Sequence, residues 1–422
     1  MTAATLSLAP TLPQAAYFLI GPGAWLVFAM GMLIAWHRMQ RLRRSNHAIP
    51  TVPPPVTVLI PAKDEGEGVR ECLDRVLKLD YPNLTILAID DRSTDQTGAI
   101  MDELAAAHPD RLSAFHVPPG SLPAGWLGKC NALHTASREA SGEWLLFVDS
   151  DVKVEPHSLT KVLSQAVARE YDAVSIMTRL ECHNFWEALV LPLCAVSVGT
   201  IGVMSVTNNE RRRNTAFANG QFFLIRRSAY KKVGGHAAVR DNITEDVALM
   251  RVLKAAGFRT RLYNGQNLAS TRMHTTWRQM FNGWARIFSG VTERRPWRIL
   301  AAMAFVAFSG LSAYVALAYG LIAAVRGDGR MWLTLAASHV ALMTILLAII
   351  YALSGNARRL ALAFPVGAAI LLAIYAYALR ACYTGRIAWR GTHYVSGAPA
   401  DAAPPATPSS RPGRRGTPVT RT

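Results

Sequence analysis

The chain has 422 residues, 51% of them hydrophobic, and long apolar blocks near both ends favour one water-exposed domain flanked by membrane spans over two soluble domains. Its formal net charge of +17 comes largely from arginine clusters beside these blocks, which suits an anionic membrane surface and argues against nucleic acid as a partner. The five cysteines show neither zinc-site spacing nor the density of a disulfide scaffold, which excludes both classes and indicates a reducing compartment.

The first predicted element is a membrane-spanning helix over 15–36, preceded by a short N-terminal segment, 1–14. The block at 15–36 carries no charged residue and is long enough to cross a bilayer. The sequence HRMQRLRR follows it at 37–44, and positive charge there places this end of the span in the cytoplasm. A cleaved signal peptide is disfavoured, because no positive charge precedes the block and the block is too long.

Residues 45–298 form the predicted cytoplasmic domain, in which strand-like and helix-like segments alternate. Apolar segments bounded by turn-forming residues predict strands at 53–62, 83–91, 143–151 and 171–180. Segments with helical periodicity lie between them, at 67–79 and 94–108. This order predicts an α/β fold with a mixed, mainly parallel sheet flanked by helices and joined by right-handed crossovers.

Acidic residues follow three of these strands at their carboxyl ends, where sheets of this kind bind ligands. A single Asp at a strand end is usually a turn former or a helix cap, as we expect for Asp95. The repetition at three strands instead predicts one shared ligand site. The acidic residues concerned are Asp64, Glu65, Asp90, Asp91, Asp149 and Asp151.

Asp149 and Asp151 stand one residue apart, so their charges repel unless a cation or a proton lies between them. A divalent cation such as Mg²⁺ or Mn²⁺ meets this need, because it takes oxygen ligands from the protein and from a diphosphate together. Lys129, upstream in GWLGKCNAL, is a candidate to bind phosphate or sugar oxygens. The residues thus predict a metal site for a diphosphate-containing ligand.

The segment 184–206 is apolar enough to span a membrane. A span there would put the acidic sequences on either side of it on opposite faces of the membrane, where they could not share a site. We therefore expect an interfacial helix in the cytoplasmic leaflet, broken by Pro192 and glycines. A buried core helix is the alternative.

Three further candidate spans lie at 299–325, 332–353 and 360–380, within a membrane region of 299–382. Residues 383–422 are rich in Pro, Ala, Ser and Arg and predict a mostly disordered tail. Four spans would leave this tail outside the cell, whereas its arginines favour the cytoplasm. The conflict leaves open that one candidate span is re-entrant.

Six motifs, taken in order, resemble the inverting family 2 glycosyltransferases of the Rossmann-like GT-A fold. They are VLIPAKDE, AIDDRSTDQT, LPAGWLGKCNAL, LLFVDSDV, ANGQFFLIRRSAYKKVGG and NITEDVALMRVLKAAGF. The similarity covers roughly residues 50–290. It is to the membrane-bound branch of the family, which includes ceramide glucosyltransferases and hopanoid- or carotenoid-associated bacterial glycosyltransferases. It implies a multi-pass protein of the inner membrane that moves sugar from a nucleotide-sugar donor to a lipid or polyisoprenoid acceptor. A polysaccharide synthase and an inactive membrane scaffold or receptor are the alternatives.

The resemblance also implies roles for individual residues. The donor-binding residues would be Pro61, Glu65, Asp91, Lys129 and Asp149. Asp149 and Asp151 would form the Mg²⁺ or Mn²⁺ site, and the metal would stabilise the departing diphosphate. Asp246 would be the catalytic base that takes the acceptor's proton, with the adjacent Glu245 as its rival. The alternative is that Asp246 has no catalytic role and only caps or charges the first turn of a helix, where the helix dipole favours a negative charge.

Processive members of that family carry a QxxRW sequence after the base. Here Gln279 and Trp284 are present, but no Arg precedes the Trp, and Arg286 follows it instead. The departure argues against chain extension and leaves Trp284 and Arg286 as candidates for acceptor and diphosphate contact. His274 is expected to be a surface residue in preference to a metal ligand. The sequence WRGTHY at 389–394 resembles a motif that follows the last span on the cytoplasmic side.

Overall fold

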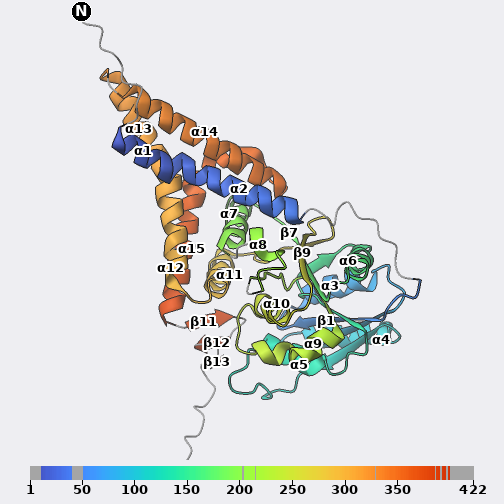
Figure 1. Cartoon of the computed structure of the whole chain (residues 1–422). Coiled ribbons are helices and arrows are strands. Elements are labelled where there is room, and N and C mark those ends of the chain that lie inside the picture. The colour runs from blue at the N-terminus through green and yellow to red at the C-terminus, as the bar shows by residue number, and fades with distance from the viewer. Residues whose placement is uncertain are drawn as a thin grey trace, which may run out of the picture.

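The chain forms an α/β domain joined to a group of long apolar helices (Figure 1). This computed structural model describes residues 11–39, 51–201, 204–213, 215–327, 329–384, 386–389, 392–395 and 398–399. Most of the arginine cluster at 37–44 and most of the predicted tail at 383–422 lie outside the described residues, as does part of WRGTHY.

A seven-stranded sheet forms the centre of the domain, in the order β3-β2-β1-β4-β8-β6-β9. Neighbouring strands are parallel except around β8, which runs antiparallel to both β4 and β6. The mixed, mainly parallel sheet is therefore confirmed, and β1, β2, β4 and β6 are the four predicted strands. The strands are β1 Val56–Ala62, β2 Leu84–Asp90, β3 Leu112–His116, β4 Trp144–Phe147, β6 Ala173–Met177, β8 Phe223–Arg226 and β9 Thr260–Asn264.

Helices cover both faces of this sheet, because alternate residues of a strand point to opposite faces. Val58 and Ile60 of β1 join one apolar core with α3, α4 and α6, whereas Leu59 joins a second with α5, α9 and α10. The helices are α3 Glu67–Leu77, α4 Thr97–Ala107, α5 Gly128–Ala136, α6 Ser158–Ala168, α9 Arg227–Lys232 and α10 Glu245–Ala255.

Two smaller sheets accompany the main one. The first, in the order β5-β10-β7, starts directly after Asp151 and consists of β5 Val152–Val154, β10 Ala269–Thr271 and β7 Arg179–Leu180. The second follows the last helix and consists of β11 Arg386–Trp389, β12 Thr392–Val395 and β13 Ala398–Pro399.

Four helical stretches in the described part of the chain are long and apolar enough to cross a membrane, one N-terminal and three C-terminal as predicted: Leu12–Met39, Pro296–Val325, Arg330–Leu353 and Arg358–Thr384. They comprise α1 Leu12–Phe18, η1 Leu19–Gly23 and α2 Ala24–Met39; α12 Pro296–Ala304, η4 Phe305–Leu311 and α13 Ser312–Val325; α14 Arg330–Leu353; and η5 Arg358–Ala363 with α15 Phe364–Thr384.

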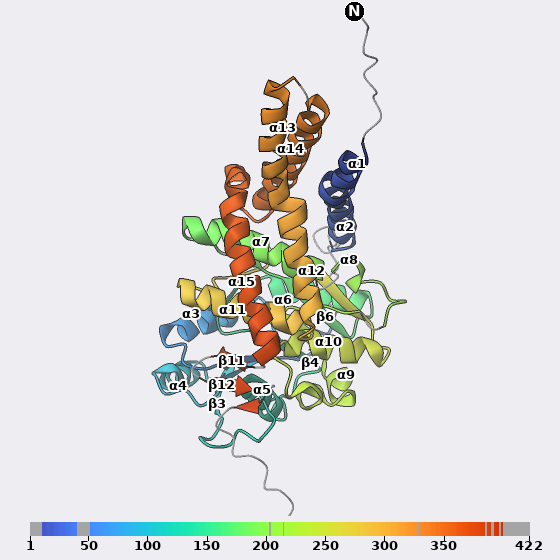
Figure 2. The ribbon, with the colours of Figure 1, turned by 90° about the vertical axis from the view of Figure 1, so that its left-hand side faces the viewer.

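Helices α7 Phe185–Ile201, α8 Met204–Thr207 and α11 Trp277–Val291 lie between the domain and the long apolar helices (Figure 1). Helix α7 lies crosswise to α12 and α15 (Figure 2). The prediction that Pro192 breaks this segment is wrong, since α7 continues through Pro192 to Ile201. Packing explains the continuity: Leu189, Val190 and Cys194 are fully buried against α11, α15 and the neighbouring helices, which offsets the hydrogen bond that proline removes. The helix thus has buried residues on its protein-facing side, as in the core-helix alternative, and it also reaches the surface.

Strand β4 leads directly into Asp149, so its packing should support both the fold and the site. Leu146→Ala removes a fully buried side chain, and we expect unfolding free energy to fall by about 2–5 kcal/mol through lost burial and a cavity. Thermal unfolding of the detergent-solubilised protein would show this as a lower midpoint. The matched change at exposed Val52, Val52→Ala, should leave the midpoint in place. Equal midpoints for the two variants would contradict the assignment of β4 to the core.

Candidate functional site

The loops that follow β1, β2 and β4 bind one another at the carboxyl edge of the sheet, as the sequence predicts. The Ser150 hydroxyl donates to Glu65 Oε1 at 2.8 Å, which ties the β4 loop to the β1 loop. The backbone N–H of Thr94 donates to Asp64 Oδ1 at 2.7 Å, which ties the β2 loop to the same segment. Asp95 accepts from the N–H of Thr97 at 3.0 Å, a short-range turn contact of the predicted kind.

Lys129 joins the two acidic motifs of the chain. Its Nζ lies 2.6 Å from Asp149 Oδ1, at the end of β4, and 2.6 Å from Glu245 Oε1, in the first turn of α10. Burial would lower the pKa of Lys129, but the charges of Asp149 and Glu245 outweigh it and hold the pKa well above its usual value. One ammonium group therefore stays charged between two carboxylates that come from distant parts of the sequence.

Asp246 lies beside this ion-pair bridge and is held by backbone groups. Its Oδ2 accepts from the N–H of Gly220 at 2.6 Å, and its Oδ1 accepts from the N–H of Val247 at 2.8 Å. Burial, and then the charge of Glu245, raise the pKa of Asp246 to about 7, against these hydrogen bonds. A carboxylate of raised proton affinity next to a cavity has the chemistry of a general base.

Gly220 is a site residue to which the sequence alone assigned no role. A side chain there would meet Asp246, because an added Cβ would lie 3.3 Å from Asp246 Oδ2. The loop is held by Asn219, whose Nδ2 donates to the carbonyl of Ile176 at 3.2 Å and whose N–H donates to the Ser175 hydroxyl at 2.8 Å. The signal in the sequence was the ANGQ motif itself, which precedes β8.

Asp149 and Asp151 suit a divalent cation by their chemistry. Burial, and then the charges of Asp149 and Glu65, raise the pKa of Asp151 to about 6, as expected for a carboxylate that lacks sufficient positive charge nearby. Among the described residues no set of three or more His, Cys, Asp and Glu side chains is grouped to hold a metal ion alone. A cation held by these two carboxylates would take its remaining ligands from a bound diphosphate. His274 is half-buried against Gly283 of α11.

Two of the expected donor-binding residues are enclosed by protein. Pro61 is buried within β1, opposite Ile89 of β2. Asp91 is 3% exposed, and its Oδ1 pairs with the Arg92 guanidinium at 2.8 Å. Burial raises the pKa of Asp91, and Arg92 opposes that rise. Both residues are thus shielded from solvent.

A cavity of about 230 Å³ is lined by the acidic motifs and by residues of α7 and α11. Its charged end includes Lys129, Asp149, Glu245 and Asp246. Its apolar wall comes from two helices, with Pro192, Ala195 and Val198 from α7 and Trp284, Ile287 and Val291 from α11. Arg286 also lines it, as do Ser354 and Asn356 of the segment that links α14 to η5. Trp284 and Arg286 thus share a cavity with Asp246, and the link between two of the long apolar helices also contributes to its lining.

Comparisons with known proteins agree with this architecture. The family model for Glycosyl transferase family 21 matches residues 23–398. Two curated relatives named 4,4'-diaponeurosporenoate glycosyltransferase, from Staphylococcus aureus (strain MRSA252) and Staphylococcus haemolyticus (strain JCSC1435), are each 22% identical to the chain. These matches cover 65% and 61% of this chain and 72% and 68% of the relatives.

Among solved structures, the chain is similar to the mannosyltransferase PcManGT from Pyrobaculum calidifontis in complex with GDP-Man and Mn²⁺. That match has a TM-score of 0.48 and 20% identity, and it covers 88% of this chain and 98% of the other. The resemblance to carotenoid-associated GT-A glycosyltransferases is confirmed by the family match, the curated relatives and the mixed sheet. Since the family model spans most of its length, the chain belongs to glycosyl transferase family 21.

Proposed function

We propose that the chain is a membrane-bound, metal-dependent, inverting glycosyltransferase that moves a sugar from a nucleotide-sugar donor to a lipid or polyisoprenoid acceptor. The observation that carries this proposal is the cavity, which has Asp246 at one end and the apolar residues of α7 and α11 at the other. An acceptor with one polar end and an apolar body matches such a cavity. The diaponeurosporenoate named for the curated relatives is a carotenoid-type acceptor and has the same character.

Asp246 is the better candidate for the base, because the two acidic residues differ in their partners. Glu245 gives an oxygen to Lys129 at 2.6 Å, so this carboxylate is already engaged in an ion pair. Asp246 accepts hydrogen bonds from the backbone N–H groups of Gly220 and Val247, and its elevated pKa means that it binds a proton more readily. The contacts from Gly220 and Val247 would aim this carboxylate at the acceptor hydroxyl while that oxygen attacks the anomeric carbon.

Asp149 and Asp151 would hold the divalent cation. When bound, a Mg²⁺ or Mn²⁺ ion supplies positive charge to the diphosphate that leaves the sugar. Lys129 lies at the same end of the cavity and would bind phosphate or sugar oxygens of the donor. Glu65, held by Ser150, and Asp91 would support the nucleotide side of the site.

We also propose that the domain lies on the cytoplasmic side and that α15 is the re-entrant segment. The turn between α13 and α14 and the start of α1 lie at the end of the helix group away from the domain, whereas α15 runs beside α12 toward the domain (Figure 2). Some 44% of the apolar window of Arg358–Thr384 is buried in protein, against 17–28% for the other three candidates. Three crossings would then leave both the domain and the end of α15 in the cytoplasm.

The metal proposal predicts loss of activity on chelation. EDTA should abolish transfer of a radiolabelled sugar by purified membranes, and Mn²⁺ or Mg²⁺ should restore it. Asp151→Ala should remove donor-dependent transfer while the protein stays folded, because one of the two cation ligands is gone. The control Asp110→Asn alters an exposed carboxylate after α4 and should keep wild-type transfer. Full activity in excess chelator would contradict the proposal.

The base proposal predicts that Asp246→Asn lowers single-turnover transfer by roughly 10²–10⁴-fold, since the amide keeps the size of the side chain but cannot accept the proton. Affinity for the nucleoside diphosphate, measured by calorimetric titration, should change little. Glu245→Gln is the matched comparison and should have the smaller effect on transfer. A near-normal rate for Asp246→Asn together with a slow Glu245→Gln would reassign the base to Glu245.

The same prediction has a pH readout. A base must be ionised to act, and burial raises the pKa of Asp246 to about 7, so wild-type transfer should fall as the pH drops through that value. The residual transfer of Asp246→Asn should lack this fall. An unchanged acidic limb in the variant would assign it to another group.

The orientation predicts a pattern of thiol labelling in intact cells. In a background with the native cysteines replaced, Asp102→Cys on α4 and Tyr383→Cys near the end of α15 should resist a membrane-impermeant maleimide. Arg326→Cys, in the exposed turn after α13, should react readily. Reaction at Tyr383→Cys with protection at Asp102→Cys would show that α15 crosses the bilayer. Reaction at Asp102→Cys would show that the orientation is reversed.

A further inference from the structure

Three aromatic side chains form an exposed patch where the N-terminal ends of α7 and α11 meet. Phe185, Trp186 and Trp277, called here the aromatic patch, are 53%, 41% and 43% exposed. Ring centroids lie 5.0 Å apart for Phe185 and Trp186 and 5.4 Å apart for Trp186 and Trp277. Large aromatic side chains gathered at a surface are costly in water and mark a contact site.

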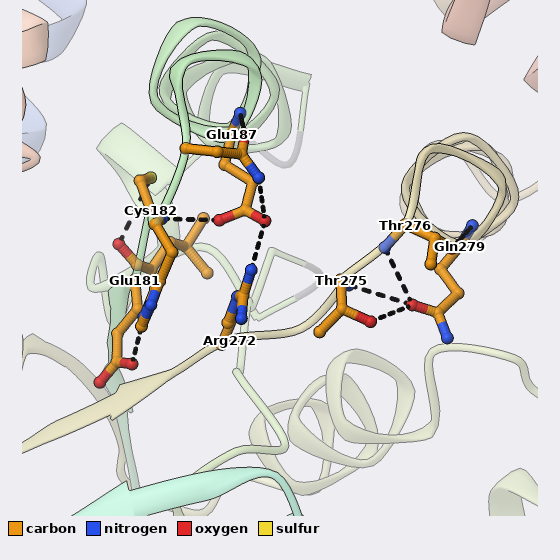
Figure 3. Close-up of polar contacts among 10 residues, drawn as sticks. Glu181, Cys182, Glu187, Arg272, Thr275, Thr276 and Gln279 are labelled. Atoms are coloured by element: carbon orange, nitrogen blue, oxygen red, sulfur yellow. Dashed lines mark hydrogen bonds and ion pairs between the residues drawn. The ribbon is translucent and has the colours of Figure 1, made fainter.

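Buried polar contacts hold the patch in place. Glu187, in the first turn of α7, accepts hydrogen bonds from the N–H of His183 at 2.7 Å and from Asn184 Nδ2 at 2.8 Å. It also pairs with the Arg272 guanidinium at 3.0 Å, across to the segment that leads into α11 (Figure 3). The Glu187 side chain is 7% exposed, so loss of Arg272 would leave a buried charge without its ionic partner. This clamp, Glu187 with Arg272, keeps Trp186 next to Trp277.

The start of α11 is fixed as well. The Thr276 hydroxyl accepts from the N–H of Gln279 at 3.3 Å, and Gln279 Oε1 accepts from the N–H of Thr276 at 3.2 Å (Figure 3). This capping box sets the direction of the first turn, which carries Trp277. The patch is therefore a preorganised surface on two anchored helix ends.

The surroundings of the patch favour a lipid surface. Helix α7 lies crosswise to α12 and α15, as expected for a helix in the plane of a membrane that those helices enter (Figure 2). Tryptophan rings are enriched at the level of lipid head groups, because each has an apolar body and a polar N–H. Arg278, next to Trp277, is exposed and forms no ion pair with any described residue, which suits anionic head groups.

We propose that the aromatic patch inserts into the interfacial layer of the cytoplasmic leaflet, against anionic phospholipid, and sets the depth of the cavity in the bilayer. The inference rests on the proposed membrane placement of the chain and not on glycosyl transfer. The depth follows from α7 itself, since one helix carries Trp186 at its start and the cavity residues Pro192, Ala195 and Val198 further along. Fixing the start of α7 thus fixes where an acceptor's polar end meets Asp246.

The test measures the depth of a fluorophore on the full chain in lipid nanodiscs that contain anionic phosphatidylglycerol. The label is attached to Phe185→Cys, with the native cysteines replaced. We expect quenching by a nitroxide at the lipid head group and protection from aqueous iodide. Val315→Cys on α13 serves as the membrane reference and Asp110→Cys as the water reference.

The references separate the possible failures. Iodide quenching at Phe185→Cys with Val315→Cys still protected would overturn the patch proposal while leaving the membrane placement intact. Iodide quenching at both positions would overturn the placement itself. A third outcome is that Phe185→Cys is protected from iodide only at high protein concentration and is not quenched by the head-group nitroxide. This outcome would assign the patch to contact with a second copy of the chain and would also overturn the proposal.

A clamp variant tests how the patch is held. Arg272→Gln removes the ionic partner of Glu187, so the Phe185→Cys label should lose nitroxide quenching while the Val315→Cys label stays protected from iodide. The matched control Arg278→Gln leaves the Glu187–Arg272 clamp in place. In this variant the Phe185→Cys label should still be quenched by the nitroxide, but this quenching should depend less on the phosphatidylglycerol content of the nanodisc. Unchanged nitroxide quenching of Phe185→Cys in Arg272→Gln, or a loss accompanied by iodide quenching at Val315→Cys, would overturn the proposed role of the clamp.

Discussion

The ion-pair bridge at Lys129 is the interaction on which the site depends. Two carboxylates, Asp149 and Glu245, each lie 2.6 Å from its ammonium group. Without that cation the end of β4 and the start of α10 would bring like charges together in a partly buried place, at a cost that the fold could offset only by protonation or separation. The bridge therefore allows the two acidic motifs to share one site. It also distinguishes Glu245, which is paired with Lys129, from Asp246, which accepts from backbone N–H groups and forms no ion pair with any residue that the structure describes.

The site depends equally on the junction between the domain and helices α7 and α11. The domain supplies the charged end of the cavity, and α7, α11 and the segment after α14 supply the other end. Neither part forms the cavity alone. This division suits a reaction in which a water-soluble donor meets an apolar acceptor, because each substrate approaches from the phase in which it dissolves. In the proposed function, α7 is both a wall of the cavity and the means by which the protein is positioned against lipid.

The antiparallel strand β8, within an otherwise parallel sheet, helps to form the site. It runs antiparallel between β4 and β6, and the turn before it brings the N–H of Gly220 to Asp246 Oδ2. A backbone donor of this kind survives every substitution at Gly220 except proline, which has no N–H. It is sensitive to bulk, however, because a Cβ at Gly220 would approach the carboxylate closely. The local geometry of Asp246 is thus set by the sheet topology and not by its own helix alone.

The sequence by itself determined those strands and helices that local periodicity and length are enough to recognise. The apolar runs that end in Asp64, Asp90 and Asp149 are strands β1, β2 and β4, and the uncharged blocks are the long apolar helices, because periodicity and length report directly on which face is buried. The order of the motifs was enough to identify the family. Only the tertiary structure paired Lys129 with Glu245, Gly220 with Asp246 and Arg272 with Glu187. Each of these contacts joins segments far apart in the chain, and its existence depends on strand order and helix packing, which local periodicity does not encode.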